Sequence, residues 1–107
     1  AQTRGLIGRE RLARMKKTAV LVNIARGEVV DEGALAEYLA EGRIFAAGLD
    51  VYEKEPEIHP SLLAAPSAVL LPHLGSATVE TRERMGRLAA ENLLAVLAGT
   101  EPPCPVN

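Results

Sequence analysis

Arg26, Glu55 and His73 are the side chains of this sequence best suited to acid–base chemistry on a small anion. A guanidinium carries a rigid fork of donors that matches a carboxylate. Histidine exchanges a proton near neutral pH, and a carboxylate beside it stabilises the charged ring and fixes which nitrogen holds the proton. Taken singly, the three are more simply explained as a surface arginine, a solvated acidic loop and a structural histidine. Their shared position after predicted strands favours a site.

Each of the three residues comes shortly after an apolar segment with the composition of a strand. These segments are residues 19–24, 45–51 and 69–71. In an open α/β sheet the carboxyl ends of the strands carry the ligand contacts. Asp50 falls at such an end, and Gly75 lets the backbone after His73 come close to a ligand. We therefore expect Arg26, Glu55 and His73 to meet at one edge of a sheet.

Helical patterns separate and follow these strands. Asp31 is a good N-cap and Gly42 a good stop for a helix over 32–41. A longer helix is predicted over about 78–98, where apolar residues recur at three- and four-residue steps. Strand, helix and strand form a right-handed βαβ unit. The predicted fold class is α/β, the second half of a Rossmann-type, doubly wound parallel sheet, with a long carboxyl-terminal helix.

The first predicted strand points to a missing neighbour. Residues 19–24 form a continuous apolar run, which is typical of a strand covered on both faces. No G-x-G-x-x-G motif follows any strand, so the phosphate-binding half of such a fold is not in this sequence. The sequence also opens in polar residues without a methionine. We expect a carboxyl-terminal fragment of a longer protein.

Composition and spacing exclude several functions. The 12 Lys and Arg are mixed with the 14 Asp and Glu, which disfavours nucleic acid and anionic membranes as partners. No apolar run approaches the roughly 20 residues of a membrane span. The single cysteine, Cys104, cannot form an internal disulfide, so we expect a cytoplasmic protein. Acidic residues and histidines lack the spacing of a metal site, and the serines lack a nucleophile elbow.

Taken together, the motifs resemble the D-2-hydroxyacid dehydrogenases over nearly the whole sequence. They run from TRGLIGRERLARMKKTAVLVNIARGEVVDEGAL through the stretch from Gly42 to Pro56, then VLLPHLGSAT and AAENLLAVLAG. Their order and spacing are more specific than any one segment. Within the family, LVNIARG and LPHLGSAT are most similar to the glyoxylate/hydroxypyruvate reductases.

The resemblance implies a role for each matched side chain. Arg26 would hold the substrate carboxylate and carbonyl oxygen, His73 would give that oxygen its proton, and Glu55 would orient the imidazole. The cofactor would be NAD or NADP, bound through Ile24, Ala25, Arg26, Asp50, His73, Leu74 and Gly75. Substrate contacts would come from Arg26, His73 and Ser76.

The resemblance also implies an activity for the parent protein. It would transfer a hydride between NAD(P)H and a small 2-oxo acid, such as glyoxylate or hydroxypyruvate, and would be a homodimer. Residues 1–107 would be the carboxyl-terminal half of the cofactor domain, with the helix at 78–98 and the tail at 99–107 crossing toward a substrate domain. The fragment alone would be inactive. Alternatives are a phosphoglycerate dehydrogenase, a corepressor of the same fold, and a non-catalytic self-associating module.

Overall fold

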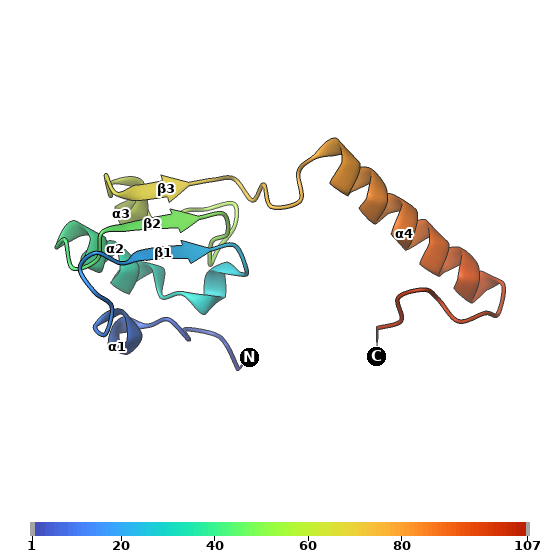
Figure 1. The fold of residues 1–107 in the computed structure, drawn as a ribbon, viewed down its shortest axis with the longest axis horizontal. Coiled ribbons are helices and arrows are strands. Elements are labelled where there is room, and N and C mark those ends of the chain that lie inside the picture. Colours follow the sequence, from blue (N-terminus) through green and yellow to red (C-terminus); the bar gives the residue numbers. More distant parts are fainter. Residues whose placement is uncertain (1, 107) are drawn as a thin grey trace. The chain divides into compact units, whose positions relative to one another are not determined.

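Three short parallel strands form a sheet in the order β1-β2-β3 (Figure 1). They are β1 (Val20–Asn23), β2 (Ala46–Leu49) and β3 (Ala68–Leu70). The structure is a computed structural model that describes residues 2–106. It divides into two units, Ala1–Gly75 and Ser76–Asn107, and the first contains the sheet. The predicted α/β class and parallel βαβ unit are confirmed.

Helix α2 (Glu32–Ala40) connects β1 to β2. It begins where predicted because the Asp31 carboxylate accepts a hydrogen bond from the Ala34 amide at 2.9 Å. Gly42 follows its end with a φ of 62°, a conformation that glycine adopts without strain. The other helical segments of this unit are short, namely α1 (Arg9–Leu12), the 3-10 turn η1 (Gly27–Val29) and α3 (Pro60–Leu63).

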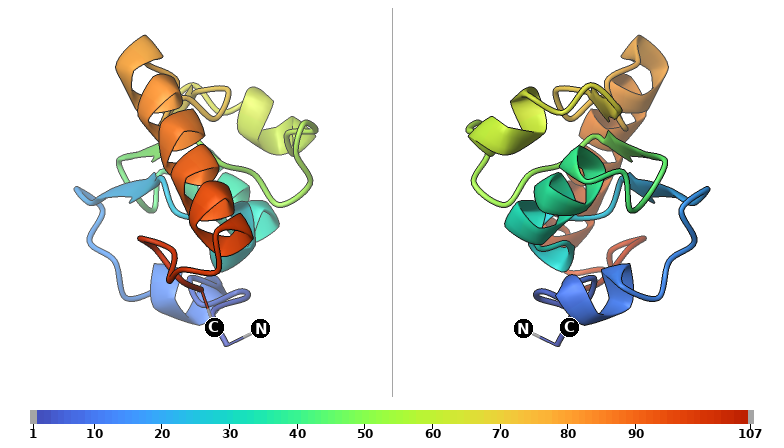
Figure 2. Two further views of the ribbon diagram at one scale, coloured as in Figure 1. Left: turned by 90° about the vertical axis from the view of Figure 1, so that its right-hand side faces the viewer. Right: turned by 90° about the vertical axis from the view of Figure 1, so that its left-hand side faces the viewer.

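The core of the first unit lies between the helices and one face of the sheet. Seen along the strands, α2 and α3 lie on the same side of the sheet (Figure 2). Leu35 of α2 and Leu62 of α3 are fully buried, together with Leu12 of α1, and they pack with Leu21 and Leu49 of the strands. Burial of each such side chain stabilises the fold by about 1.5–3 kcal/mol.

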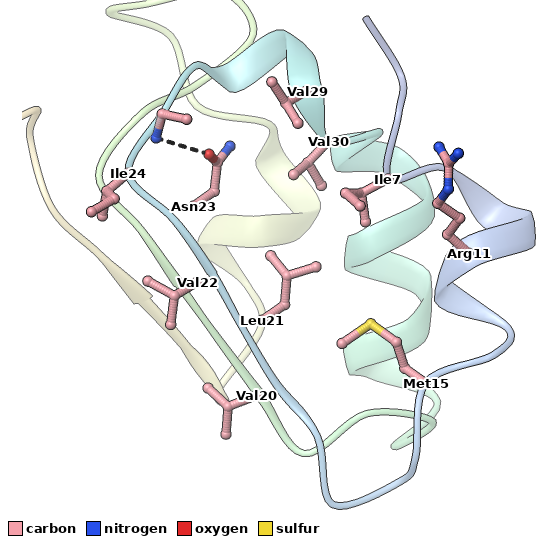
Figure 3. Close-up of a pocket in the computed structure, with 11 residues that line it drawn as sticks. Ile7, Arg11, Met15, Val20, Leu21, Val22, Asn23, Ile24, Val29 and Val30 are labelled. Carbon is pink, nitrogen blue, oxygen red and sulfur yellow. Dashed lines mark hydrogen bonds between the residues drawn. The ribbon is translucent and has the colours of Figure 1, made fainter. Parts of the chain in front are cut away.

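The opposite face of the sheet is open, so the expectation of a strand covered on both faces is wrong for this unit. Val20 and Val22 of β1 are 54% and 65% exposed, and Val69 of β3 is 63% exposed. Figure 3 shows Val20 and Val22 on the side of β1 opposite Leu21. The reason is that the helices that pack on this sheet, α2 and α3, both lie on its other face.

The second unit contains α4 (Val79–Leu97). The Thr78 side chain caps it by accepting the Thr81 amide at 3.2 Å, and Gly99 follows with a φ of 71°, so the predicted helix is confirmed. None of its 19 residues, all of which the structure describes, is buried. Among residues 2–106, no helix is both long and apolar enough to cross a bilayer.

Candidate active site

The carboxyl ends of the three strands lie at one edge of the sheet, because the strands are parallel (Figure 1). Arg26 follows the end of β1, Asp50 directly follows β2, and His73 follows β3. Glu55 lies in the loop after β2. The edge that the strand pattern predicted therefore carries all four residues.

His73 and Glu55 are in direct contact. Nδ1 of the His73 ring lies 2.8 Å from Oε2 of Glu55, and the two side chains are 48% and 36% exposed. An ionised carboxylate at Nδ1 favours the proton on that nitrogen. The ring is thereby oriented, and Nε2 is the nitrogen through which His73 can exchange a proton with a ligand.

The pKa of Glu55 is lowered below the usual glutamate range. The main cause is the hydrogen bond with His73, and a second is the Tyr52 amide, which donates to Oε1 at 3.0 Å. The positive charges of His73 and Arg26 lower this pKa further. Glu55 is therefore a carboxylate at neutral pH. Arg26 lies close enough for its charge to act on this carboxylate.

A buried asparagine shapes the turn that carries Arg26. Asn23 donates from Nδ2 to the Arg26 carbonyl at 2.9 Å and accepts the Ala25 amide on Oδ1 at 3.1 Å. Figure 3 shows the second of these bonds. The next residue, Gly27, is in close contact with another loop, because a Cβ there would lie 1.8 Å from the carbonyl carbon of Tyr52. The Arg26 turn thus packs directly on the loop that carries Glu55.

His73 has a backbone conformation that is uncommon for a residue with a side chain, with a φ of 55°. Asp50 supports it: its two carboxylate oxygens accept the amides of Leu74 and Gly75 at 2.6 and 2.8 Å. Asp50 is itself only 5% exposed. Its observed partners are therefore backbone groups of the His73 loop, and its contact with a cofactor stays a prediction.

Comparison with known proteins decides the family. Residues 1–75 match the family described as "D-isomer specific 2-hydroxyacid dehydrogenase, NAD binding domain". The chain belongs to this family. Residues 1–75 are therefore part of an NAD-binding domain.

Two similar relatives of this dehydrogenase segment are reductases. The chain is 57% identical over 100 residues to glyoxylate/hydroxypyruvate reductase B of Pectobacterium atrosepticum, an alignment that covers 92% of the chain and 31% of the relative. It is 54% identical over 106 residues to the glyoxylate reductase of Thermococcus kodakarensis, with 99% of the chain and 32% of the relative covered. The chain therefore spans about a third of the length of these relatives.

Two solved structures have the same fold as the chain. The NADPH-dependent glyoxylate/hydroxypyruvate reductase of Sinorhizobium meliloti, in complex with NADP and malonate, matches 99% of the chain with a TM-score of 0.95 and 42% identity, over 33% of its own length. The TT0316 protein of Thermus thermophilus matches 99% of the chain with a TM-score of 0.92 and 54% identity, over 34% of its length.

The residues that the dehydrogenase motifs assign to the cofactor lie at or beside this edge. Ile24 is 74% and Leu74 48% exposed, so both offer apolar surface to a flat ring. An open groove of about 500 Å³ runs along β1 and reaches Ile24 and Ala25, but its lining does not include Glu55 or His73 (Figure 3). The contact of these side chains with a nicotinamide ring stays a prediction. Ser76 begins the second unit, and its contact with substrate stays a prediction.

Sequence patterns missed three residues that shape the dehydrogenase site. Asn23 was visible only as a polar residue in an apolar strand, and Glu32 only as an acid in the first turn of α2. Tyr52 donates from its hydroxyl to the Leu49 and Leu71 carbonyls at 3.2 and 2.8 Å, which ties the ends of β2 and β3 together. Among residues 2–106, no group of His, Cys, Asp or Glu is arranged to hold a metal ion.

Proposed function

We propose that this chain is the carboxyl-terminal part of the cofactor domain of an enzyme that reduces a small 2-oxo acid to the D-2-hydroxy acid. The observation that carries the proposal is the 2.8 Å contact between His73 and Glu55, beside the charge of Arg26. A self-associating module has no need of an imidazole oriented by a carboxylate, whereas general acid–base catalysis uses such a pair. A corepressor of the same fold keeps similar residues, so turnover is what distinguishes it from the enzyme.

The three side chains divide the chemistry between them. The Arg26 guanidinium binds the substrate carboxylate and faces the negative charge that develops on the carbonyl oxygen. His73 donates a proton from Nε2 to that oxygen. Glu55 accepts from Nδ1, which holds the ring in place and fixes which nitrogen carries the proton. In the reverse direction His73 takes the proton from the substrate hydroxyl.

The nicotinamide would be held by residues of the same edge. Ile24, Ala25 and Arg26 would line its ring from the turn after β1, and Leu74 and Gly75 would approach through the backbone. Asp50 would reach the carboxamide or ring, in addition to its observed bonds to Leu74 and Gly75. Bound NADH or NADPH supplies the hydride.

The substrate we propose is glyoxylate or hydroxypyruvate. The support is that a relative with 57% identity is named a reductase of both acids, and a relative with 54% identity is named a reductase of glyoxylate. Ser76, which directly follows Gly75 in the sequence, would add a substrate contact. Helix α4 and the tail would lead toward a substrate domain in the longer protein, whose absence would leave the 107-residue chain inactive.

Turnover by the full-length protein tests this proposal. Oxidation of NADH and of NADPH is followed with glyoxylate, hydroxypyruvate and pyruvate as substrates. We expect activity with the first two, and a loss in His73→Ala of at least about 100-fold in kcat, because general acid–base catalysis contributes at least that much. His59→Ala is the matched control, since His59 lies before α3, outside the proposed set. Near-normal turnover in His73→Ala would refute the role of the imidazole.

We also infer that the protein is a homodimer. The support is apolar surface of a kind that monomers rarely leave uncovered. On the open face of the sheet, Val20, Val22 and Val69 are each more than half exposed. A second copy of the protein carries the same apolar face and is always present at an equal concentration, so we infer that it is the partner.

A further inference from the structure

Each loop of the proposed site is hydrogen-bonded to a buried polar side chain. Among residues 2–106, the buried polar or charged side chains are Asn23, Glu32 and Asp50. Each bonds to the backbone of a different loop at the carboxyl edge of the sheet. Asn23 holds the turn of Arg26, Asp50 holds the turn of His73, and Glu32 holds the loop of Glu55.

Two members of this set, Asn23 and Glu32, have no assigned role in the reaction, and the charged one is Glu32. It lies in the first turn of α2, is 6% exposed, and accepts the Glu53 amide on Oε1 at 2.7 Å. A buried carboxylate is unfavourable unless such bonds compensate its lost hydration. This contact joins residues 21 positions apart and, among residues 2–106, is the one side-chain hydrogen bond between α2 and that loop. Glu32 therefore connects the first turn of α2 directly to the loop that carries Glu55.

The peptide that Glu32 holds is adjacent to the one that Glu55 binds. The Tyr52 amide donates to Oε1 of Glu55, and the next amide, that of Glu53, donates to Glu32. Gly27 packs against the same peptide, where a Cβ would lie 1.8 Å from the Tyr52 carbonyl carbon and 2.3 Å from the Glu53 nitrogen. The Tyr52–Glu53 peptide thus lies between Gly27 and the Glu32 carboxylate, and Glu55 accepts from the peptide directly before it.

We propose that Glu32 is a positioning residue, whose carboxylate holds the Tyr52–Glu53 peptide against Gly27 and so keeps Glu55 within reach of His73. The effect on turnover rests on the function proposed above. The effect on the Glu55–His73 contact does not, because it follows from the hydrogen bonds alone.

Two substitutions of Glu32 distinguish the effect of its side-chain length from the effect of its charge. Glu32→Asp keeps the charge and suits the first turn of a helix, but its shorter side chain withdraws from the Glu53 amide. Glu32→Gln keeps the length and an acceptor oxygen, and serves as the conservative rescue. We expect Glu32→Asp to weaken the Glu55–His73 contact, and Glu32→Gln to retain it.

The first measurement is the pH titration of the Glu55 carboxyl by 13C NMR in the 107-residue chain. In Glu32→Asp the midpoint rises toward the ordinary glutamate value, because Glu55 loses His73. In Glu32→Gln it stays near that of the wild type. A folded Glu32→Asp variant with an unchanged Glu55 midpoint overturns the proposal. Should Glu32→Asp not fold, rapid hydrogen exchange of the Glu53 amide in the wild-type chain overturns it instead.

The second measurement is turnover in the full-length protein. We expect kcat to fall about 10- to 100-fold in Glu32→Asp, as small misplacements of catalytic groups do, with little change in KM for the nucleotide. Glu32→Gln should remain close to wild type. An active wild type with an unaffected Glu32→Asp variant contradicts the positioning role. A wild type that reduces none of the acids contradicts the proposed function, while the titration still decides the role of Glu32.

Discussion

At the scale of single residues, the ionisation of Glu55 is the most direct measure of the proposed site. Its pKa is lowered chiefly by His73, then by the Tyr52 amide, and also by the charge of Arg26. A carboxylate with a depressed pKa stabilises the folded state at pH values above 4.5, the ordinary glutamate value. That contribution is lost as pH falls through the lowered pKa.

The removal of each cation should therefore raise the Glu55 pKa by a different amount. We expect a large upward shift of its NMR midpoint in His73→Ala, because the hydrogen bond is the principal cause. Arg26→Met should give a smaller shift in the same direction, because Arg26 acts only through its charge. An unchanged midpoint in His73→Ala would show that the 2.8 Å contact is not formed in solution.

At the scale of elements, the start of α2 links stability to the site. Asp31 caps this helix, and the neighbouring Glu32 holds the loop of Glu55. A frayed first turn would therefore release both bonds. The same helix supplies Leu35 and Leu39 to the core, so its first turn is anchored by packing as well as by the cap.

We expect Asp31→Ala to lower the free energy of unfolding by about 1 kcal/mol, the usual loss on removal of an N-cap side chain. Urea denaturation of the 107-residue chain, with the helical signal in circular dichroism as probe, measures this change. Asp31→Asn is the control, because an asparagine side chain also caps well. An equal loss in both variants would indicate that charge, rather than the hydrogen bond to Ala34, stabilises the turn.

At the scale of the whole molecule, the main feature is apolar surface that is exposed to solvent. The sheet of the first unit has one open face, and the second unit contains a helix none of whose 19 described residues is buried. The chain spans about a third of its relatives, which leaves two thirds of their length to supply further surfaces. In a solution of the 107-residue chain alone, other copies of the chain are the only protein surface that can cover this apolar area.

We therefore expect the 107-residue chain to self-associate at high concentration. Sedimentation velocity over a range of concentrations should show a shift from monomer to dimer or larger species. Val22→Lys places a charge on the open face and should weaken association. Leu63→Lys is the matched control, because Leu63 has nearly the same exposure but lies on α3, which packs against α2. Equal association in both variants would exclude the open face as the contact.

The sequence by itself determined the order of elements and the place of the site. Apolar runs, the N-cap at Asp31 and the helix stop at Gly42 give the β-α-β path, because these signals are local. Parallel strands share one carboxyl edge, so the positions of Arg26 and His73 after strands were enough to predict that they share it. Family motifs supplied the choice of Glu55 among its acidic neighbours.

Only the tertiary structure decided how that edge is held. The bonds from Asp50 to Leu74 and Gly75, and from Glu32 to Glu53, join residues 21 to 25 positions apart. Such contacts depend on the path of the loops, which no periodicity encodes. The open face of the sheet could not be predicted from the sequence either. An apolar run indicates that both faces of a strand are suited to burial, but not whether this chain contains the elements that bury them.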